Sequence, residues 1–283
     1  MKNTFIVNGY GVPKNIFKDD NYHFYLNMVF NRVWDVVHNS PQIPSQPLRG
    51  EAKQNPPLKV RGGEGGVMLI FSGGPTDCFP PYKRTEAGEM KRYFLTLMRR
   101  DKVRDVTKHW KIVLQQKALT TVENLVYGKE KIYSLSEVPT LSVGTKSKES
   151  RRDGRPVGVQ GYGNPSTGSG DIRVYYFCEN TRFERSHILS TRVFPKTWRP
   201  SVIPIDFDVS PQRYLDADLI RRREEKSLQY ELWALKSPEN LKKWRKIYQE
   251  RIAFLRKAGP AKHQEAVKEW WEKRLTNLSL KPK

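Results

Sequence analysis

Val67-Met68-Leu69-Ile70-Phe71 runs directly into Ser72-Gly73-Gly74-Pro75-Thr76, and a helical pattern begins near Thr85. An apolar run before a glycine turn is typical of a buried strand, so this stretch predicts a strand, a turn and a helix in succession. Two glycines let the backbone approach a phosphate or carboxylate, and the start of the next helix offers N–H groups and partial positive charge. An ordinary tight turn has the same composition, so the turn alone does not decide between ligand loop and simple turn.

The same alternation extends outward from this stretch. Short apolar or β-branched runs predict five strands, at Thr4-Asn8, Val67-Ser72, Lys111-Gln115, Ile172-Cys178 and Val202-Asp208. Apolar residues at helical spacing separate them, at Asn21-Val37, Thr85-Met98 and Thr121-Tyr133. Strands that alternate with helices predict an α/β fold: a three-layer, Rossmann-like parallel sheet of about five strands with helices on both faces.

Composition divides the chain into two parts. We expect residues 1-210 to form the Rossmann-like domain, interrupted by two long loop insertions at 40-66 and 140-170. The first is rich in proline and glycine, which favours disorder, whereas the second is open between disorder and a lid. Residues 211-283 read as a basic, all-helical extension of three helices, with breaks at Ser237-Pro238 and Gly259-Pro260.

The formal net charge of +21 favours anionic partners: nucleic acid, phosphorylated metabolites or an acidic membrane surface. Between Arg213 and Lys283 there are 19 Lys and Arg against 10 Asp and Glu, a net of +9, which leaves +12 for the other 212 residues. The basic surplus is therefore spread along the chain. No run approaches the roughly 18 apolar residues of a membrane span. Cys78 and Cys178 have neither the spacing of a disulfide framework nor that of a zinc site, so a reducing cytoplasm is the simplest setting. The five histidines show no metal-ligand spacing.

Polar or glycine clusters follow four of the predicted strands. Because carboxyl ends of parallel strands meet at one sheet edge, we expect these clusters to converge there. The third cluster offers Thr120 or Thr121 as a helix N-cap. The four clusters are Gly9-Tyr10-Gly11; Ser72-Gly73-Gly74-Pro75-Thr76 with Glu86; Thr121 with Glu123 and Asn124; and Arg182 with Arg185.

This ordered set of motifs resembles the YdcF/SanA/ElyC family, whose Rossmann-like domain has long been catalogued as one of unknown function. The similarity covers about residues 4 to 208 without the two insertions, and it leaves the helical extension unexplained. It implies a polar pocket rim made of Ser72, Gly73, Gly74, Glu86, Thr121, Glu123, Asn124 and Arg185. Some relatives resemble envelope-biogenesis factors, and at least one branch is associated with S-adenosylmethionine, so S-adenosylmethionine or another nucleotide-like ligand is a candidate by resemblance alone. The chain lacks the membrane anchor of the first group and the Gly-x-Gly-x-Gly loop usual in methyltransferases.

The chain departs from the family pattern at two places. Gln115 or Gln116 stands where the family usually has an acidic residue, and Arg182 stands where it usually has a histidine. A guanidinium stays protonated, so Arg182 cannot act as a general acid or base. Together with Arg185 it could instead clamp an anion. The resemblance therefore leaves open whether the site catalyses a reaction.

Two hypotheses of different class follow. In the first, the chain binds a small anionic or nucleotide-like ligand, and Gly9, Gly11, Thr76 and Arg182 join the implied rim residues. In the second, it is a nucleic-acid-associated binding protein without enzymatic activity, which uses Arg221-Arg222-Arg223 and Lys242-Lys243 of the helical extension. Simpler roles compete: Glu86 and Glu123 as helix-dipole or capping partners, Thr121 as an N-cap, Cys178 as a core residue, and the extension's tryptophans as packing anchors.

Overall fold

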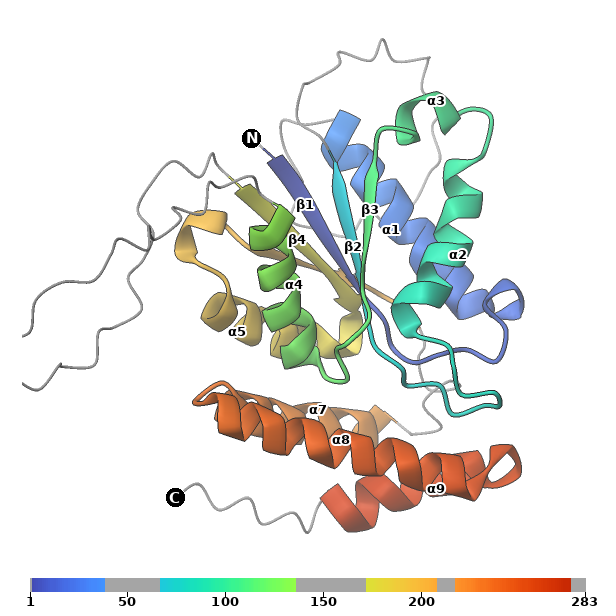
Figure 1. The fold of residues 1–283 in the computed structure, drawn as a ribbon, viewed down its shortest axis with the longest axis vertical. Coiled ribbons are helices and arrows are strands. Elements are labelled where there is room, and N and C mark those ends of the chain that lie inside the picture. Colours follow the sequence, from blue (N-terminus) through green and yellow to red (C-terminus); the bar gives the residue numbers. More distant parts are fainter. Residues whose placement is uncertain (1, 39–66, 136–171, 208–216, 276–283) are drawn as a thin grey trace, which may run out of the picture.

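The computed structural model describes residues 2–38, 67–135, 172–207 and 217–275 (Figure 1). Within these ranges the predicted α/β architecture is present: an all-parallel sheet, helices on both of its faces, and a helical C-terminal part. The segments predicted as insertions, 40-66 and 140-170, lie outside the described residues, and so does the predicted boundary at Pro211.

The sheet has the strand order β3-β2-β1-β4-β5, and every neighbouring pair is parallel. The chain starts in the middle, runs outward to β3, and then returns to the other side of β1. The direction of progression thus reverses between β1 and β4, which is where open α/β sheets bind ligands, at the carboxyl ends of the strands. The strands are β1 (Lys2–Asn8), β2 (Met68–Ser72), β3 (Lys111–Gln115), β4 (Ile172–Glu179) and β5 (Ser201–Ile205).

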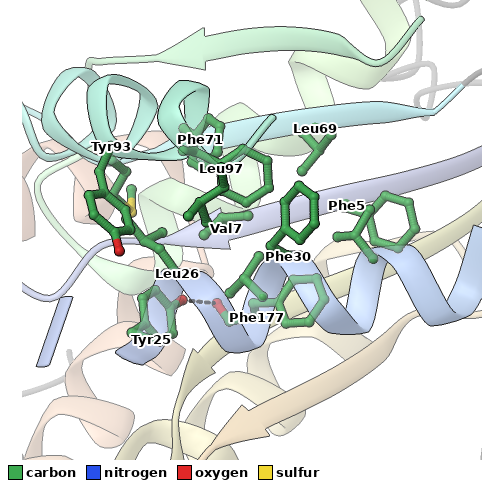
Figure 2. Close-up of a cluster of buried hydrophobic side chains, with 14 of the residues drawn as sticks. Phe5, Val7, Tyr25, Leu26, Phe30, Leu69, Phe71, Tyr93, Leu97 and Phe177 are labelled. Atoms are coloured by element: carbon green, nitrogen blue, oxygen red, sulfur yellow. Dashed lines mark hydrogen bonds between the residues drawn. The ribbon is translucent and has the colours of Figure 1, made fainter. Parts of the chain in front are cut away.

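One face of the sheet is covered by α1 (Asp20–His38) and α2 (Glu86–Met98). Figure 2 shows this layer, in which alternate residues of the central strands, such as Phe5 and Phe71, meet apolar side chains of both helices. The Tyr25 hydroxyl of α1 lies 2.8 Å from the Asn8 carbonyl oxygen and 3.2 Å from that of Phe177. It therefore holds α1 against the ends of β1 and β4. The short helices η1 (Ile16–Lys18) and α3 (Arg104–Thr107) complete this side.

The opposite face is covered by α4 (Thr121–Leu135) and α5 (Phe183–Val193). Intervening strand residues such as Ile6 and Tyr176 point to this side, as the two-residue period of a strand requires. The sequence did not predict α5 and gave only a strand-end loop there. Its buried stripe does have helical spacing, but the stripe includes Arg185, Ser186 and Ser190, so the apolar pattern is too weak to reveal a helix.

The predicted three-helix extension is present as α7 (Ala217–Ala234), α8 (Pro238–Ala258) and α9 (His263–Glu269), which continues into a π-helical turn at Trp270–Leu275. Ser237 caps α8, and its side chain accepts a hydrogen bond from the Asn240 N–H at 3.1 Å. The helices lie across the carboxyl ends of the strands (Figure 1). Their apolar cluster includes Leu119 and Val122 of the β3–α4 region, so the extension packs against the sheet edge.

The tryptophans of this extension serve as packing anchors. Trp244, Trp270 and Trp271 are buried, which confirms the simpler of the two sequence interpretations. No helix among the described residues combines the length and apolar character needed to cross a lipid bilayer. Both cysteines are buried thiols, and Cys178 lies in the core beneath α4 and α5, as expected from its place in a buried strand.

Candidate functional site

A cavity of about 420 Å³ lies between the carboxyl edge of the sheet and the C-terminal helices. Its walls come from the loops that follow β1, β2 and β3, from the segment after β4, and from α7, α8 and α9. The polar loops therefore do converge on one edge. The sequence-predicted residues that line it are Gly9, Gly11, Thr76, Glu86, Thr121, Asn124, Arg182 and Arg185, whereas Ser72, Gly73, Gly74 and Glu123 lie outside its lining.

The N–H groups at the start of α2, which follows the glycine turn after β2, are bonded within the protein. The Glu86 and Ala87 N–H groups, at the start of α2, donate to the carbonyl oxygens of Gly74 and Gly73, each at 3.1 Å. The side-chain oxygen of Thr85 accepts from the Gly88 N–H at 3.1 Å. The turn itself and Thr85 satisfy these groups, so they give no support to the expected anion site at this helix start.

The glycines instead make room for Glu86. A Cβ atom placed on Gly9 would lie 2.7 Å from the Cβ of Glu86, and one placed on Gly73 would lie 2.6 Å from it. Glu86 is buried, and its Oε1 accepts a hydrogen bond from the Thr76 hydroxyl at 2.6 Å. We expected a ligand to approach the backbone at these glycines, but the Glu86 carboxylate lies there instead. Glu86 also lines the cavity.

Beneath the cavity a buried polar network joins three strands to α4. The Ser72 hydroxyl lies 3.0 Å from Gln115 Oε1 and 2.8 Å from Asn124 Oδ1. The Asn124 amide in turn donates to the Asn8 side chain. Ser72 does not line the cavity, but its hydrogen bond positions Asn124, which is the member of the network that does.

Thr120 is the N-cap of α4, and its hydroxyl accepts from the Glu123 N–H at 3.2 Å. The Glu123 carboxylate accepts from the Leu119 N–H at 2.7 Å and from Arg245 of α8 at 2.6 Å. The structure thus supports the simpler reading of Glu123 as a capping residue. Thr121, the alternative cap, contributes its N–H group to a different interaction.

That interaction is with Glu231 of α7. Its Oε1 accepts from the N–H groups of Thr121, at 3.0 Å, and Val122, at 3.3 Å. Helix N-termini favour negative charge, and here the C-terminal extension supplies it. Burial raises the pKa of the Glu231 carboxyl, and the Arg185 guanidinium and the Val122 N–H offset part of that rise.

The two predicted arginines face different partners. Both terminal nitrogens of Arg185 pair with carboxylates of α7, Nη1 with Glu231 at 3.0 Å and Nη2 with Glu224 at 2.7 Å. Arg182 donates from Nη1 to the Gly9 carbonyl oxygen at 3.0 Å, and its Nε lies 3.0 Å from Glu179 Oε1. Nη2 of Arg182 forms no hydrogen bond within the described part of the chain. Of this pair, Arg182 is the one that still has a donor to offer.

Sequence reasoning placed no residue of the extension in this pocket: it gave Arg223 of α7 only as a candidate nucleic-acid contact, and it gave Arg251 of α8 and His263 of α9 no binding role. The guanidinium carbons of Arg223 and Arg251 lie 4.2 Å and 5.1 Å from the ring centroid of Trp271. Burial and then the neighbouring Arg251 lower the pKa of His263 from 6.5. One feature of the sequence indicates that Arg251 faces the protein interior: it lies between Tyr248 and Leu255 on the apolar stripe of α8.

Among the described residues, no three His, Cys, Asp or Glu side chains gather as metal ligands. Comparisons with protein-family models, with curated proteins and with solved structures found no match.

Proposed function

We propose that the cavity binds a small anionic ligand between the strand ends and the C-terminal helices. The observation that carries this proposal is the set of arginines in its wall. Burying a cation is costly unless an anion matches it, and guanidinium groups suit carboxylate and phosphate oxygens. The arginines are Arg182, Arg185, Arg223 and Arg251, and the carboxylates in the same lining are Asp19 and Glu86.

The four arginines do not contribute equally. Arg185 is already matched by Glu224 and Glu231, so its charge is compensated inside the protein. Arg182 is matched by Glu179 through Nε but keeps Nη2 free of hydrogen bonds within the described residues. Of the two arginines at the strand edge, Arg182 is therefore the one with a donor left for a ligand.

The resemblance to the YdcF/SanA/ElyC family supports the location of this site but not its ligand. A nucleotide-like anion fits an arginine-rich wall. S-adenosylmethionine fits less well, because its sulfonium group is a cation and would face the same arginines. The proposal is one of binding and assigns no reaction.

Thermal unfolding in the presence of inorganic phosphate, pyrophosphate and a mononucleotide tests this proposal, with the matching nucleoside as the uncharged reference. We expect anions to raise the midpoint and the nucleoside to leave it unchanged. Arg251→Gln should weaken the anion effect by about tenfold in affinity, or ~1.4 kcal/mol. Lys257→Gln is the control, because it removes one exposed charge from the same helix outside the cavity. Equal anion effects in both variants would refute the proposal.

Nucleic-acid binding by the extension is a second candidate, favoured by exposed Arg221, Arg222, Lys242 and Lys243 on α7 and α8. Since Trp244 and Trp271 are buried, bases cannot stack on them, and binding would rest on phosphate contacts. Its affinity should then fall steeply with salt. Fluorescence anisotropy of a labelled duplex over a salt series measures this, and no binding at low salt, or a flat series, would exclude the candidate.

A further inference from the structure

The side of the cavity formed by α7, α8 and α9, called the roof below, contains two arginines that both contact one aromatic ring. Arg223 and Arg251 come from α7 and α8, both line the cavity, and both guanidinium groups lie over Trp271. Trp271 is 4% exposed, so it is a fixed surface for them. The negative face of an indole ring attracts a guanidinium group that lies over it. Trp271 therefore helps to hold two guanidinium groups in the cavity wall.

The number of donors favours a phosphoryl group over a carboxylate. One arginine fork satisfies the two oxygens of a carboxylate, whereas a terminal phosphate has three oxygens and up to two negative charges. Here Arg223 and Arg251 line the cavity from the C-terminal helices, and Arg182 lines it from the strand edge. Three guanidinium groups in the wall of a cavity of about 420 Å³ suit the doubly charged group better.

Much of the remaining wall is apolar, so an inorganic ion would not fill it. Sites for organic ligands combine apolar walls with a few placed polar groups, and each buried apolar area adds affinity. The loops after β2 and β3 supply part of this wall, and α8 and α9 supply the rest. Its apolar members include Phe79, Leu119, Ile252, Leu255 and Val267.

We propose that the ligand is an organic phosphate, a phosphate monoester with an apolar body, whose phosphate lies against Arg223 and Arg251 and whose body contacts the apolar wall. In this arrangement Trp271 is a positioning residue. The inference rests on the proposed anion-binding function and adds the chemical class of the ligand.

Isothermal titration calorimetry with 1-naphthyl phosphate, inorganic phosphate, 1-naphthoate and 1-naphthol tests the ligand class. We expect 1-naphthyl phosphate to bind at least tenfold more tightly than the other three. If inorganic phosphate binds equally well, the proposed anion site stands, but the proposed contact between the ligand's apolar body and the cavity wall is refuted. If 1-naphthoate binds equally well, preference for phosphate is refuted while anion binding stands. If 1-naphthol binds equally well, or if none of the four binds, this inference and the proposed function both fail.

Variants of the aromatic ring test the positioning role. Trp271→Phe keeps a ring face and should retain affinity for 1-naphthyl phosphate within about threefold, whereas Trp271→Leu should lose about tenfold. Trp270→Leu is the matched control. Trp270 is as buried as Trp271, but its ring packs against that of Phe254, with 5.8 Å between the ring centroids. The variant should therefore lose stability without losing affinity for 1-naphthyl phosphate. Equal affinities of the Phe and Leu variants would overturn the role of Trp271.

Arg251→Lys keeps the charge but loses the planar fork, so it tests the same contact without removing the ring. Its affinity for 1-naphthyl phosphate should fall at least fivefold, while Lys257→Arg, on the exposed side of α8, should change nothing. An Arg251→Lys protein with full affinity would overturn the assignment of the phosphate to this cluster, even if Trp271→Leu fails to fold.

Discussion

Glu231 of α7 accepts a hydrogen bond from Arg185 of α5, with 3.0 Å between Oε2 and Nη1, and both side chains are buried. The other oxygen of the same carboxylate caps the start of α4. One side chain of the extension thus joins two helices of the α/β part at the sheet edge. The extension replaces water over these groups, and its removal would expose a buried guanidinium and a helix N-terminus together.

Replacing Glu231 should therefore destabilise the whole chain. Glu231→Ala leaves Arg185 with a single carboxylate partner and leaves the Thr121 and Val122 N–H groups of α4 without this acceptor. Breaking one side of a buried pair costs about 3–5 kcal/mol. Glu231→Gln keeps an oxygen for the Thr121 N–H and should lose less. Urea unfolding measures the difference. Glu225→Ala is the control, because Glu225 is exposed on the same helix and its pair with Arg221 should contribute no more than about 1 kcal/mol. Equal losses for Glu231→Ala and Glu225→Ala would contradict this account.

A methyl group at Gly9 should be tolerated only when Glu86 is shortened. Gly9→Ala places Cβ against the Glu86 side chain, and overpacking of this kind costs about 1–3 kcal/mol. In the double variant with Glu86→Gly, which also removes the Cβ of residue 86, the clash disappears, so the second substitution should recover part of the loss. A double-mutant cycle from urea midpoints measures this coupling, and additive effects would show that the glycine is required for another reason.

Stability should fall in mild acid partly through His263. Its pKa is lower in the folded protein than its ordinary 6.5, so the unfolded chain takes up the proton first. This contribution is fully present above pH 6.5 and is lost as pH falls through the folded-state pKa. The free energy of unfolding of His263→Asn, followed from pH 7.5 to pH 5, should therefore decline less than that of the natural chain. Parallel curves would remove His263 from the explanation.

Arg256 should hold α8 to the loop after β2. It donates from Nε to the Asp77 carbonyl oxygen at 2.9 Å and from Nη2 to that of Pro75 at 3.2 Å. Arg256→Ala should speed amide hydrogen exchange in residues 75–85 while the strands keep their protection, because only a local contact is lost. Lys257→Ala, at the next position but exposed, serves as the control. Unchanged exchange in the loop would show that Arg256 does not hold it.

The sheet was predictable because its evidence is local. The run before Ser72 is continuously apolar, and both faces of β2 are buried, as the parallel sheet demands. Helix α5 was not predictable in the same way, because Arg185 and two serines occupy its buried stripe. Periodicity detects apolar contact and does not detect a polar stripe that is matched by ion pairs.

Only the residues that the strand ends contribute to the site could be predicted from the sequence. Arg182 and Arg185 attracted attention because arginines at the end of a buried strand need matching charge. Their matching residues could not be read from the sequence: Glu231 is 46 positions from Arg185 and 110 from Thr121, and no local pattern pairs residues so far apart. Neither Arg223 nor Arg251 could be assigned to the cavity from the sequence for the same reason, since only folding brings their guanidinium groups onto Trp271.

The cavity wall takes residues from both Gly9 and Val267, and this spread has a consequence for synthesis. During translation the strand ends emerge long before α8 and α9, so the growing chain carries Arg182 and Arg185 without their cover. A ligand that needs both floor and roof can bind only after α9 has left the ribosome. The completed fold, and no earlier intermediate, is therefore the species that such a ligand would select and protect from proteolysis.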